Sequence, residues 1–351
     1  MDFRNICTVG PAMEAGAGRV ALIVSASFEK RCLHVAENLS SKYWADAFLV
    51  CRFVGDYELQ RLQDARFEKL RGDVRLASGK ADMIECAVPT YEPSKGIHQL
   101  EQNIGHLAEL GISHIDFDVS TFTKQYIILI LNLLDNYLPN ASLRILYSPA
   151  DRYGPASTTQ KQLSSRVRQV IPIPGFDTFV DMADVKDVLV AFMGFEEHRV
   201  ATLVAALKPA HCIPVFQRRR NTHLGAKAVY ESNRRLIDLL HARYAPSSEI
   251  VDGENPNSTR ELLLRLYDQW VKERGYVLLI APHGSKMEAV GAYLFCREAA
   301  DPGHVGIVYA MPVRYNERDY SGSPIGYIVE YWVRSAQLAG SAKLPVSATA
   351  L

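Results

Sequence analysis

The sequence predicts an α/β fold made of two doubly wound parallel-sheet units in tandem. Short apolar runs rich in β-branched residues alternate with amphipathic segments along the chain, and the runs lack the polar alternation of half-exposed strands. Three sequence landmarks also occur twice in the same order. Since parallel strands need crossover connections, this alternation is typical of Rossmann-like units, and the repetition predicts that the two units arose by internal duplication.

Eight apolar runs are the predicted strands. In chain order they are ALIVSA, FLVCRF, HIDFDV and RILYS, then VLVAFM, HCIPVF, VLLIAP and GIVYAM. The amphipathic segments predict helices over about residues 29–42, 94–110, 123–137, 196–207, 226–244, 259–273 and 286–299. Residues 55–93 and 218–258 carry charged and turn-forming residues without a clean period, which predicts insertions or lids.

Pro-rich and polar stretches near residue 165 mark the expected boundary between the units. The predicted organisation is a flexible N-terminus (1–17), a first Rossmann-like unit (18–165), a second one (166–335) and a flexible C-terminal tail (336–351).

The repeated landmarks support the duplication. VALIVSASFEKR and VLVAFMGFEEHR place Glu29 against Glu197 and Arg31 against Arg199. The other two share a spacing of 162 residues (286 − 124 = 162). They pair Thr123-Lys124 with Ser285-Lys286, and SLRILYSPADRYG with HVGIVYAMPVRYN, matching Tyr147/Tyr309, Arg152/Arg314 and Tyr153/Tyr315. Two merely similar βαβ units are the alternative explanation.

Composition narrows the classes of partner. The 39 basic and 39 acidic residues cancel, so long duplex nucleic acid is not an expected partner. Six cysteines are scattered singly without metal-type spacing, which indicates buried reduced thiols, a cytoplasmic location and neither metal nor cofactor. The N-terminus lacks a signal-peptide pattern and the longest apolar run, 126–134, is too short to span a bilayer, so no membrane partner is expected.

Ligands of open α/β sheets bind beyond the carboxyl ends of strands, where helix N-termini attract anions. Lys124 and Lys286 each begin a predicted helix after a strand, where a cation opposes the helix dipole unless an anion neutralises it. Thr123 and Ser285 can cap these helices or bind phosphate, and Gly284 lets the backbone approach a ligand.

Further candidates follow the same logic. Glu29, Arg31, Glu197 and Arg199 lie at helix starts, and Gly194 leaves room beside Arg199. Ordinary helix capping and solvated side chains are the competing interpretation. At the ends of the last strands, Tyr153, Tyr315 and Tyr320 could stack on bases and Arg314 could bind phosphate.

Catalytic signatures are few. Glu197, His283 and Asp319 are the candidates for acid–base roles, and Asp116 with Asp118 could hold a metal or act as a base.

The segment LLIAPHGSKMEAVGAYLF resembles the strand, Gly-Thr-Lys, helix motif of CRISPR-associated Rossmann-fold (CARF) domains. The tandem arrangement is similar to SAVED domains, in which two such units are fused. The resemblance implies that a cyclic oligonucleotide binds in a prokaryotic antiviral defence system, with Gly284, Ser285 and Lys286 as motif positions and Thr123-Lys124 as their partner.

The sequence therefore predicts a sensor or regulatory subunit that binds a nucleotide or another anionic small molecule between the duplicated halves. An effector protein is a possible further partner. Two alternatives remain: an enzyme that hydrolyses a nucleotide-like substrate as a phosphodiesterase, nucleotidase or glycosidase, and a protein-interaction module without a ligand.

Overall fold

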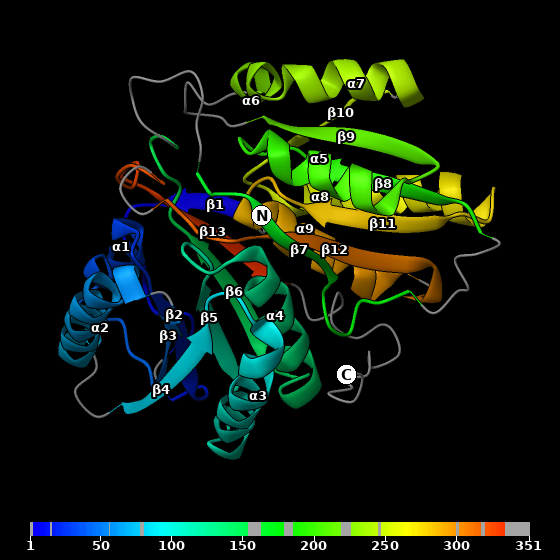
Figure 1. The fold of residues 1–351 in the computed structure, drawn as a ribbon. Helices are drawn as coiled ribbons and strands as arrows, with labels where there is room; N and C mark the ends of the chain where they lie inside the picture. Colours follow the sequence, from blue (N-terminus) through cyan, green and yellow to red (C-terminus); the bar gives the residue numbers. More distant parts are fainter. Residues whose placement is uncertain are drawn as a thin grey trace. The chain divides into compact units, whose positions relative to one another are not determined.

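The computed structural model confirms an α/β fold (Figure 1). It describes residues 3–14, 16–55, 57–77, 81–153, 163–178, 185–218, 226–244, 247–299, 302–316 and 320–333. These residues divide into two compact units. Unit 1 runs to Asp151 and resumes at Ser321, and unit 2 extends from Arg152 to Tyr320.

Unit 1 contains a sheet with the strand order β1-β13-β6-β5-β2-β3-β4 among the described residues. Its strands are β1 (Phe3–Ile6), β2 (Val20–Ala26), β3 (Ala47–Val54), β4 (Asp82–Pro89), β5 (His114–Asp118), β6 (Ser142–Tyr147) and β13 (Ile328–Val333). Its helices are η1 (Lys30–Leu33), α1 (His34–Glu37), α2 (Tyr57–Ala77), α3 (Pro93–Glu109) and α4 (Lys124–Tyr137). Strands β2 to β6 are parallel, and β13 is antiparallel to both of its neighbours.

Unit 2 contains a sheet with the order β10-β9-β8-β11-β12-β7 in the described part of the chain. Its strands are β7 (Val167–Pro172), β8 (Asp187–Phe192), β9 (His211–Arg218), β10 (Glu249–Asp252), β11 (Val277–Pro282) and β12 (Val305–Pro312). Its helices are α5 (Glu197–Leu207), α6 (Ala226–Ser232), α7 (Arg234–Tyr244), α8 (Pro256–Tyr267), the π-helix η2 (Asp268–Lys272), α9 (Lys286–Glu298) and η3 (Pro302–His304). All neighbouring strands are parallel except β7, which pairs antiparallel with β12.

The two units share one order of parallel strands. Numbered within each unit, the order is third, second, first, fourth, fifth, and an antiparallel strand lies beside the fifth. A duplication would produce this agreement, but the order is also common among doubly wound sheets. The duplication therefore stays a hypothesis.

Central strands are buried along their whole length, which explains their continuous apolar runs. Every residue of β2, β11 and β12 is buried. Helices on both faces of a parallel sheet remove water from alternate side chains on either side. In unit 2 the core cluster joins β11 and β12 to α5 and α7 through residues such as Leu203 and Ile237.

The two predicted insertions are regular structure instead. Residues 55–93 contain α2 and β4, and residues 218–258 contain α6, α7 and β10. Both strands lie at a sheet edge, β4 beside β3 and β10 beside β9. An edge strand is covered incompletely, so its sequence, such as DMIECAVP in β4, lacks the apolar run that marks a central strand.

Several predicted boundaries differ from the structure. The helix expected over 29–42 ends at Glu37, because Val9 pairs with Leu39 and hydrogen-bonds with Asn38 and Ser40. The helix expected over 226–244 is interrupted at Asn233, whose side-chain amide donates to the Gly194 carbonyl at 2.7 Å.

The predicted domain ranges also differ at their ends. The N-terminal segment 1–17 contains β1, and β13, expected in the unit 166–335, pairs with β6 in unit 1. The tail 336–351 lies outside the described residues. Cysteines are buried except Cys7, which is exposed. Among the described helices, none has the length and apolar character needed to cross a membrane.

Candidate functional site

Each unit has a topological switch point, where strand order reverses and ligands of doubly wound sheets commonly bind. It lies between β2 and β5 in unit 1 and between β8 and β11 in unit 2. Lys124 is the first residue of α4 after β5, and Lys286 is the first residue of α9 after β11. Both lysines are buried, with 7% and 8% of their surface exposed. The prediction that a lysine begins each helix is confirmed.

The residues before the lysines differ between the units. Ser285 forms a capping box: its hydroxyl accepts from the Glu288 backbone N–H at 3.1 Å, and the Glu288 carboxylate accepts from the Ser285 N–H. The Thr123 hydroxyl makes no cap bond, and its buried oxygen has no hydrogen-bond partner among the described residues. Ser285 is thus used for capping, whereas Thr123 is not.

The two predicted site glycines of unit 2, Gly194 and Gly284, allow close packing of neighbouring groups and do not leave room for a ligand. A Cβ at Gly194 would lie 2.4 Å from the His283 carbonyl oxygen, and one at Gly284 would lie 1.7 Å from a carboxylate oxygen of Glu288. The loops after β8 and β11 therefore contact each other directly. The expected room beside Arg199 is occupied by backbone.

Arg199 is an interior structural residue of unit 2. It is 1% exposed, pairs with Glu196 at 3.0 Å, and donates two hydrogen bonds to the Ala310 carbonyl at 2.9 and 2.6 Å. Its guanidinium lies 4.8 Å from the centre of the Tyr309 ring. The predicted acidic neighbour Glu197 is half-buried at the start of α5, and it is Glu196 that forms the ion pair.

Unit 1 contains the same arrangement. Arg31 is fully buried, pairs with Glu29 at 2.5 Å and donates to the Ser148 carbonyl at 2.6 Å. Glu29 also accepts from the Ser321 hydroxyl at 2.6 Å. Ser148 and Ala310 are 162 residues apart (310 − 148 = 162), the spacing of the sequence landmarks. Each of these arginines joins the start of a helix to the end of the last parallel strand. Their guanidinium groups are therefore occupied by contacts within the protein.

The tyrosines expected to stack on a base contact other rings of unit 2. Tyr153 stacks on Phe195 with centroids 6.0 Å apart, and Tyr315 meets Tyr320 edge to face at 5.5 Å. Burial raises the pKa of Tyr315 well above its usual value. Arg314 is exposed, and its carbonyl accepts from the Ser165 N–H at 2.8 Å.

Of the two catalytic candidates His283 and Asp319, the structure describes only His283. His283 is buried and stacks on Tyr309 at 5.0 Å, and its Nε2 accepts from the Ala310 N–H at 3.3 Å. Its Nε2 is therefore engaged with the backbone of β12. Asp319 lies outside the described residues.

The two aspartates of β5 have separate surroundings. Asp116 accepts two hydrogen bonds of 2.6 Å from Arg144, and others from His114 and Tyr43, which leaves little capacity for a metal. Asp118 is 2% exposed and accepts from the N–H and hydroxyl of Ser120. Burial raises the pKa of Asp118 to about 7, against the smaller lowering effect of Ser120 and Arg31.

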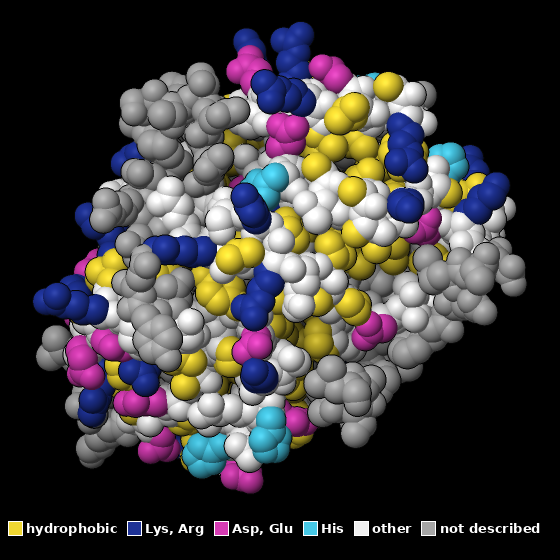
Figure 2. All heavy atoms as spheres, in the orientation of Figure 1, with side chains coloured by type: hydrophobic (Ala, Val, Ile, Leu, Met, Phe, Trp, Pro, Cys, Tyr) yellow, Lys and Arg dark blue, Asp and Glu magenta, His cyan; other side chains and the backbone are white. Residues whose placement is uncertain are grey.

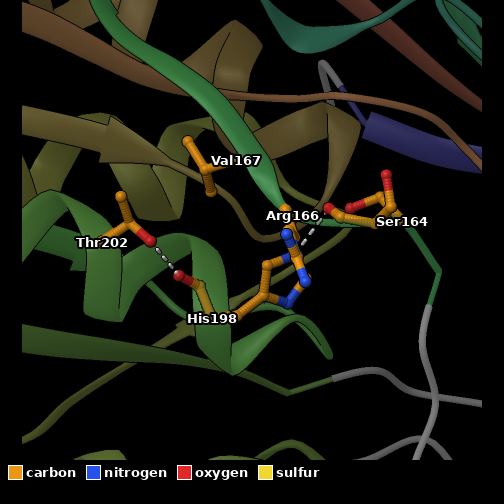
Figure 3. Close-up of a pocket in the computed structure, with 6 residues that line it drawn as sticks. Ser164, Arg166, Val167, His198 and Thr202 are labelled. Atoms are coloured by element: carbon orange, nitrogen blue, oxygen red, sulfur yellow. Dashed lines mark hydrogen bonds between the residues drawn. The ribbon is translucent and has the colours of Figure 1, made fainter.

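A pocket of about 620 Å³ lies in unit 2 beside the first turns of α5 (Figure 3). It is lined by Ser164, Ser165, Arg166, Val167, His198 and Thr202, and we call it the α5 pocket. Its two sides come from the start of β7 and from α5, which packs on β12 and β7. Ser164 forms a β-bridge with Tyr315, just past the end of β12. The pocket thus lies beside the carboxyl end of β12 and the start of the edge strand β7.

The α5 pocket is basic and rich in hydroxyls. Arg166 and His198 supply its nitrogen donors, and no acidic side chain lines it among the described residues. The carboxylate of Glu196 accepts a hydrogen bond from the Ser164 hydroxyl and forms an ion pair with Arg199.

On the face of the molecule that Figure 2 shows, basic and acidic side chains are interspersed.

Sequence reasoning missed every residue of this pocket. The run SSRVRQV lies at the predicted boundary between the units, and His198 stands between the two predicted site residues Glu197 and Arg199. A hydroxyl-rich, basic segment directly before a strand was the available signal. Its position beside α5 depends on the antiparallel pairing of β7 with β12, which the sequence does not reveal.

No protein-family model and no curated protein matches the chain. Solved structures similar to it include a protein described as a universal stress protein from Pseudomonas aeruginosa UCBPP-PA14, with 14% identity, 84% of this chain and 94% of that chain covered, and a TM-score of 0.22. A functionally unknown protein from Pseudomonas aeruginosa PAO1 has 14% identity, coverages of 84% and 93%, and a TM-score of 0.21. An N-terminal ketoreductase from the macrolactin assembly line has 10% identity, coverages of 81% and 64%, and a TM-score of 0.22.

Proposed function

We propose that unit 2 binds a phosphate-bearing small molecule of the nucleotide class in the α5 pocket. The observation that carries this proposal is the exposed Arg166 side chain, which has no protein partner among the described residues and lines a pocket of about 620 Å³. Pockets for small molecules are typically 300–1,000 Å³. Guanidinium groups bind phosphate oxygens through two parallel hydrogen bonds.

The position of the pocket supports the same proposal. It lies beside the carboxyl end of β12 and the first turns of α5, whose N-terminus carries the positive end of the helix dipole.

A separate proposal is a cyclic oligonucleotide sensor of an antiviral defence system, which is based on the resemblance to CARF and SAVED domains and does not involve the α5 pocket. In that proposal Lys124 and Lys286 would both contribute. Binding of a cyclic oligoadenylate that is lost in Lys124→Gln and in Lys286→Gln separately would support it, whereas mononucleotide binding that is indifferent to both changes would contradict it.

The proposed function is tested by titrating the full chain with AMP, ATP, GTP and cyclic oligoadenylates, by calorimetry and thermal shift. We expect at least one nucleotide to bind and to raise the melting temperature. Arg166→Ala should weaken that binding by about tenfold or more, because a hydrogen bond to a charged group is worth about 1.5–3 kcal/mol.

The matched control is Arg168→Ala. Arg168 is an exposed arginine of β7, two residues after Arg166, and it does not line the pocket, so its loss should leave affinity within about twofold. Absence of binding by every nucleotide, or equal losses in the two variants, would refute the proposal.

A further inference from the structure

The hydroxyl groups of the α5 pocket have already donated their protons within the protein. Ser164 donates to the Glu196 carboxylate, Ser165 to the Arg314 carbonyl at 3.3 Å, and Thr202 to the His198 carbonyl at 2.8 Å. A hydroxyl has one proton and two lone pairs. The hydroxyl oxygens of Ser165 and Thr202 therefore meet a ligand as acceptors, whereas Ser164 is buried.

The nitrogen groups behave differently. His198 Nε2 lies 3.2 Å from the Ser165 carbonyl oxygen, and because a carbonyl only accepts, Nε2 carries the proton of that hydrogen bond (Figure 3). Arg166 keeps its guanidinium donors available, since no described side chain accepts from them. The α5 pocket thus combines one cationic donor with several acceptor oxygens.

This division of donors and acceptors selects among phosphate compounds. Inorganic phosphate offers acceptors that suit Arg166 but has few protons for the Ser and Thr oxygens. A phosphorylated polyol has both, because its phosphate can accept from Arg166 while its own hydroxyls donate to the protein oxygens. The described lining contains one aliphatic side chain, Val167, and no aromatic ring on which a base could stack.

We infer that the α5 pocket recognises the sugar-phosphate portion of its ligand, with the phosphate on Arg166 and neighbouring sugar hydroxyls donating to Ser165 and Thr202. This inference rests on the proposed function and names the part of the nucleotide that the pocket contacts. It makes ribose 5-phosphate a sufficient ligand. The base then contributes little to affinity.

The test is calorimetric titration of the full chain with ribose 5-phosphate, 2-deoxyribose 5-phosphate, inorganic phosphate, AMP and adenosine. We expect ribose 5-phosphate to bind within about tenfold of AMP and at least about tenfold more tightly than inorganic phosphate. Adenosine, which lacks the phosphate, should bind at least about tenfold more weakly than AMP.

Variants separate the two parts of the site. Thr202→Val removes the acceptor oxygen and keeps the shape, so it should weaken ribose 5-phosphate binding about fivefold and leave inorganic phosphate unchanged. Thr202→Ser keeps the hydroxyl and should restore the affinity. Arg166→Ala should weaken both ligands, and circular dichroism and melting temperature confirm that each variant is folded.

The outcomes are distinguishable. If AMP binds in an Arg166-dependent way but ribose 5-phosphate binds no better than inorganic phosphate, this inference is wrong and the proposed function stands. If ribose 5-phosphate binds and no nucleotide does, the nucleotide class is wrong, and so is this inference, because it expects AMP to bind within about tenfold of ribose 5-phosphate. If none of these phosphate compounds binds, both fail.

Discussion

At the scale of residues, the polar groups of the two sheets divide into those committed to the fold and those still able to bind a ligand. Arg31 and Arg199 are committed, because each pairs with a carboxylate and donates to a backbone carbonyl in the interior. Buried charges persist only when they are paired in this way. Arg166 is exposed and has no such partner among the described residues, so its guanidinium is available to a ligand whereas those of the buried arginines are not.

Asp118 predicts how the stability of unit 1 depends on pH. Its pKa is raised from about 3.8 to about 7 in the folded state, so the folded protein binds more protons than the unfolded chain between these values. The free energy of unfolding should therefore fall as pH rises from about 4 to about 7, by at most roughly 4 kcal/mol from this group. Asp118→Asn removes the buried charge and should gain stability relative to wild type as pH rises from 5 to 8, in urea unfolding at each pH.

The control for this prediction is Asp151→Asn, which changes an exposed aspartate of unit 1. The stability difference between this variant and wild type should be independent of pH. Parallel pH curves for Asp118→Asn and wild type would show that the carboxyl does not titrate in this range.

At the scale of elements, helices α4 and α9 occupy corresponding places after β5 and β11, and both begin with a buried lysine. They differ in how the first turn is held. In α9 the capping box of Ser285 and Glu288 satisfies two backbone N–H groups, and Gly284 leaves the space that the Glu288 carboxylate fills. In α4 the Thr123 hydroxyl provides no equivalent bond.

This difference predicts unequal effects of one substitution at two corresponding positions. Ser285→Ala should reduce the free energy of unfolding by about 0.5–2 kcal/mol, because it removes a cap bond. Thr123→Ala should cost less, since no cap bond is lost. Urea unfolding and hydrogen exchange of the first turns of α9 and α4 measure both; equal losses would contradict the role assigned to the capping box.

At the scale of the whole molecule, the order of the chain does not coincide with the two units. Strand β13 comes after all of unit 2 but pairs with β6 of unit 1, and β1 pairs with β13. Glu330 of β13 also accepts from the buried Arg144 at 3.1 Å. Unit 1 therefore requires both ends of the chain for its sheet edge.

A chain that ends at Tyr320 tests this dependence. It lacks β13, so β1 loses its pairing partner, β6 becomes an edge strand and Arg144 loses Glu330. We expect faster hydrogen exchange in β6 and β1, with β8 and β11 of unit 2 unchanged. A chain ending at Val333, which keeps β13, is the control and should match the full-length protein; uniform deprotection of both units would contradict the independence of unit 2.

The sequence by itself determined the α/β class, the central strands and the lysine at the start of α4 and α9. Those features depend on local patterns: continuous apolar runs for strands covered on both faces, and a polar loop before an amphipathic helix. The edge strands β4 and β10 escaped prediction because partial exposure weakens their apolar pattern.

Only the tertiary structure decided which polar residues remain available. Arg199 and Arg166 are both arginines near a strand or helix start, and nothing local separates them. Arg199 meets Glu196 and the Ala310 carbonyl, whereas Arg166 lines a pocket that exists because β7 pairs antiparallel with β12. Pairing between segments more than a hundred residues apart depends on the packing of the whole unit, so a local sequence pattern does not predict it.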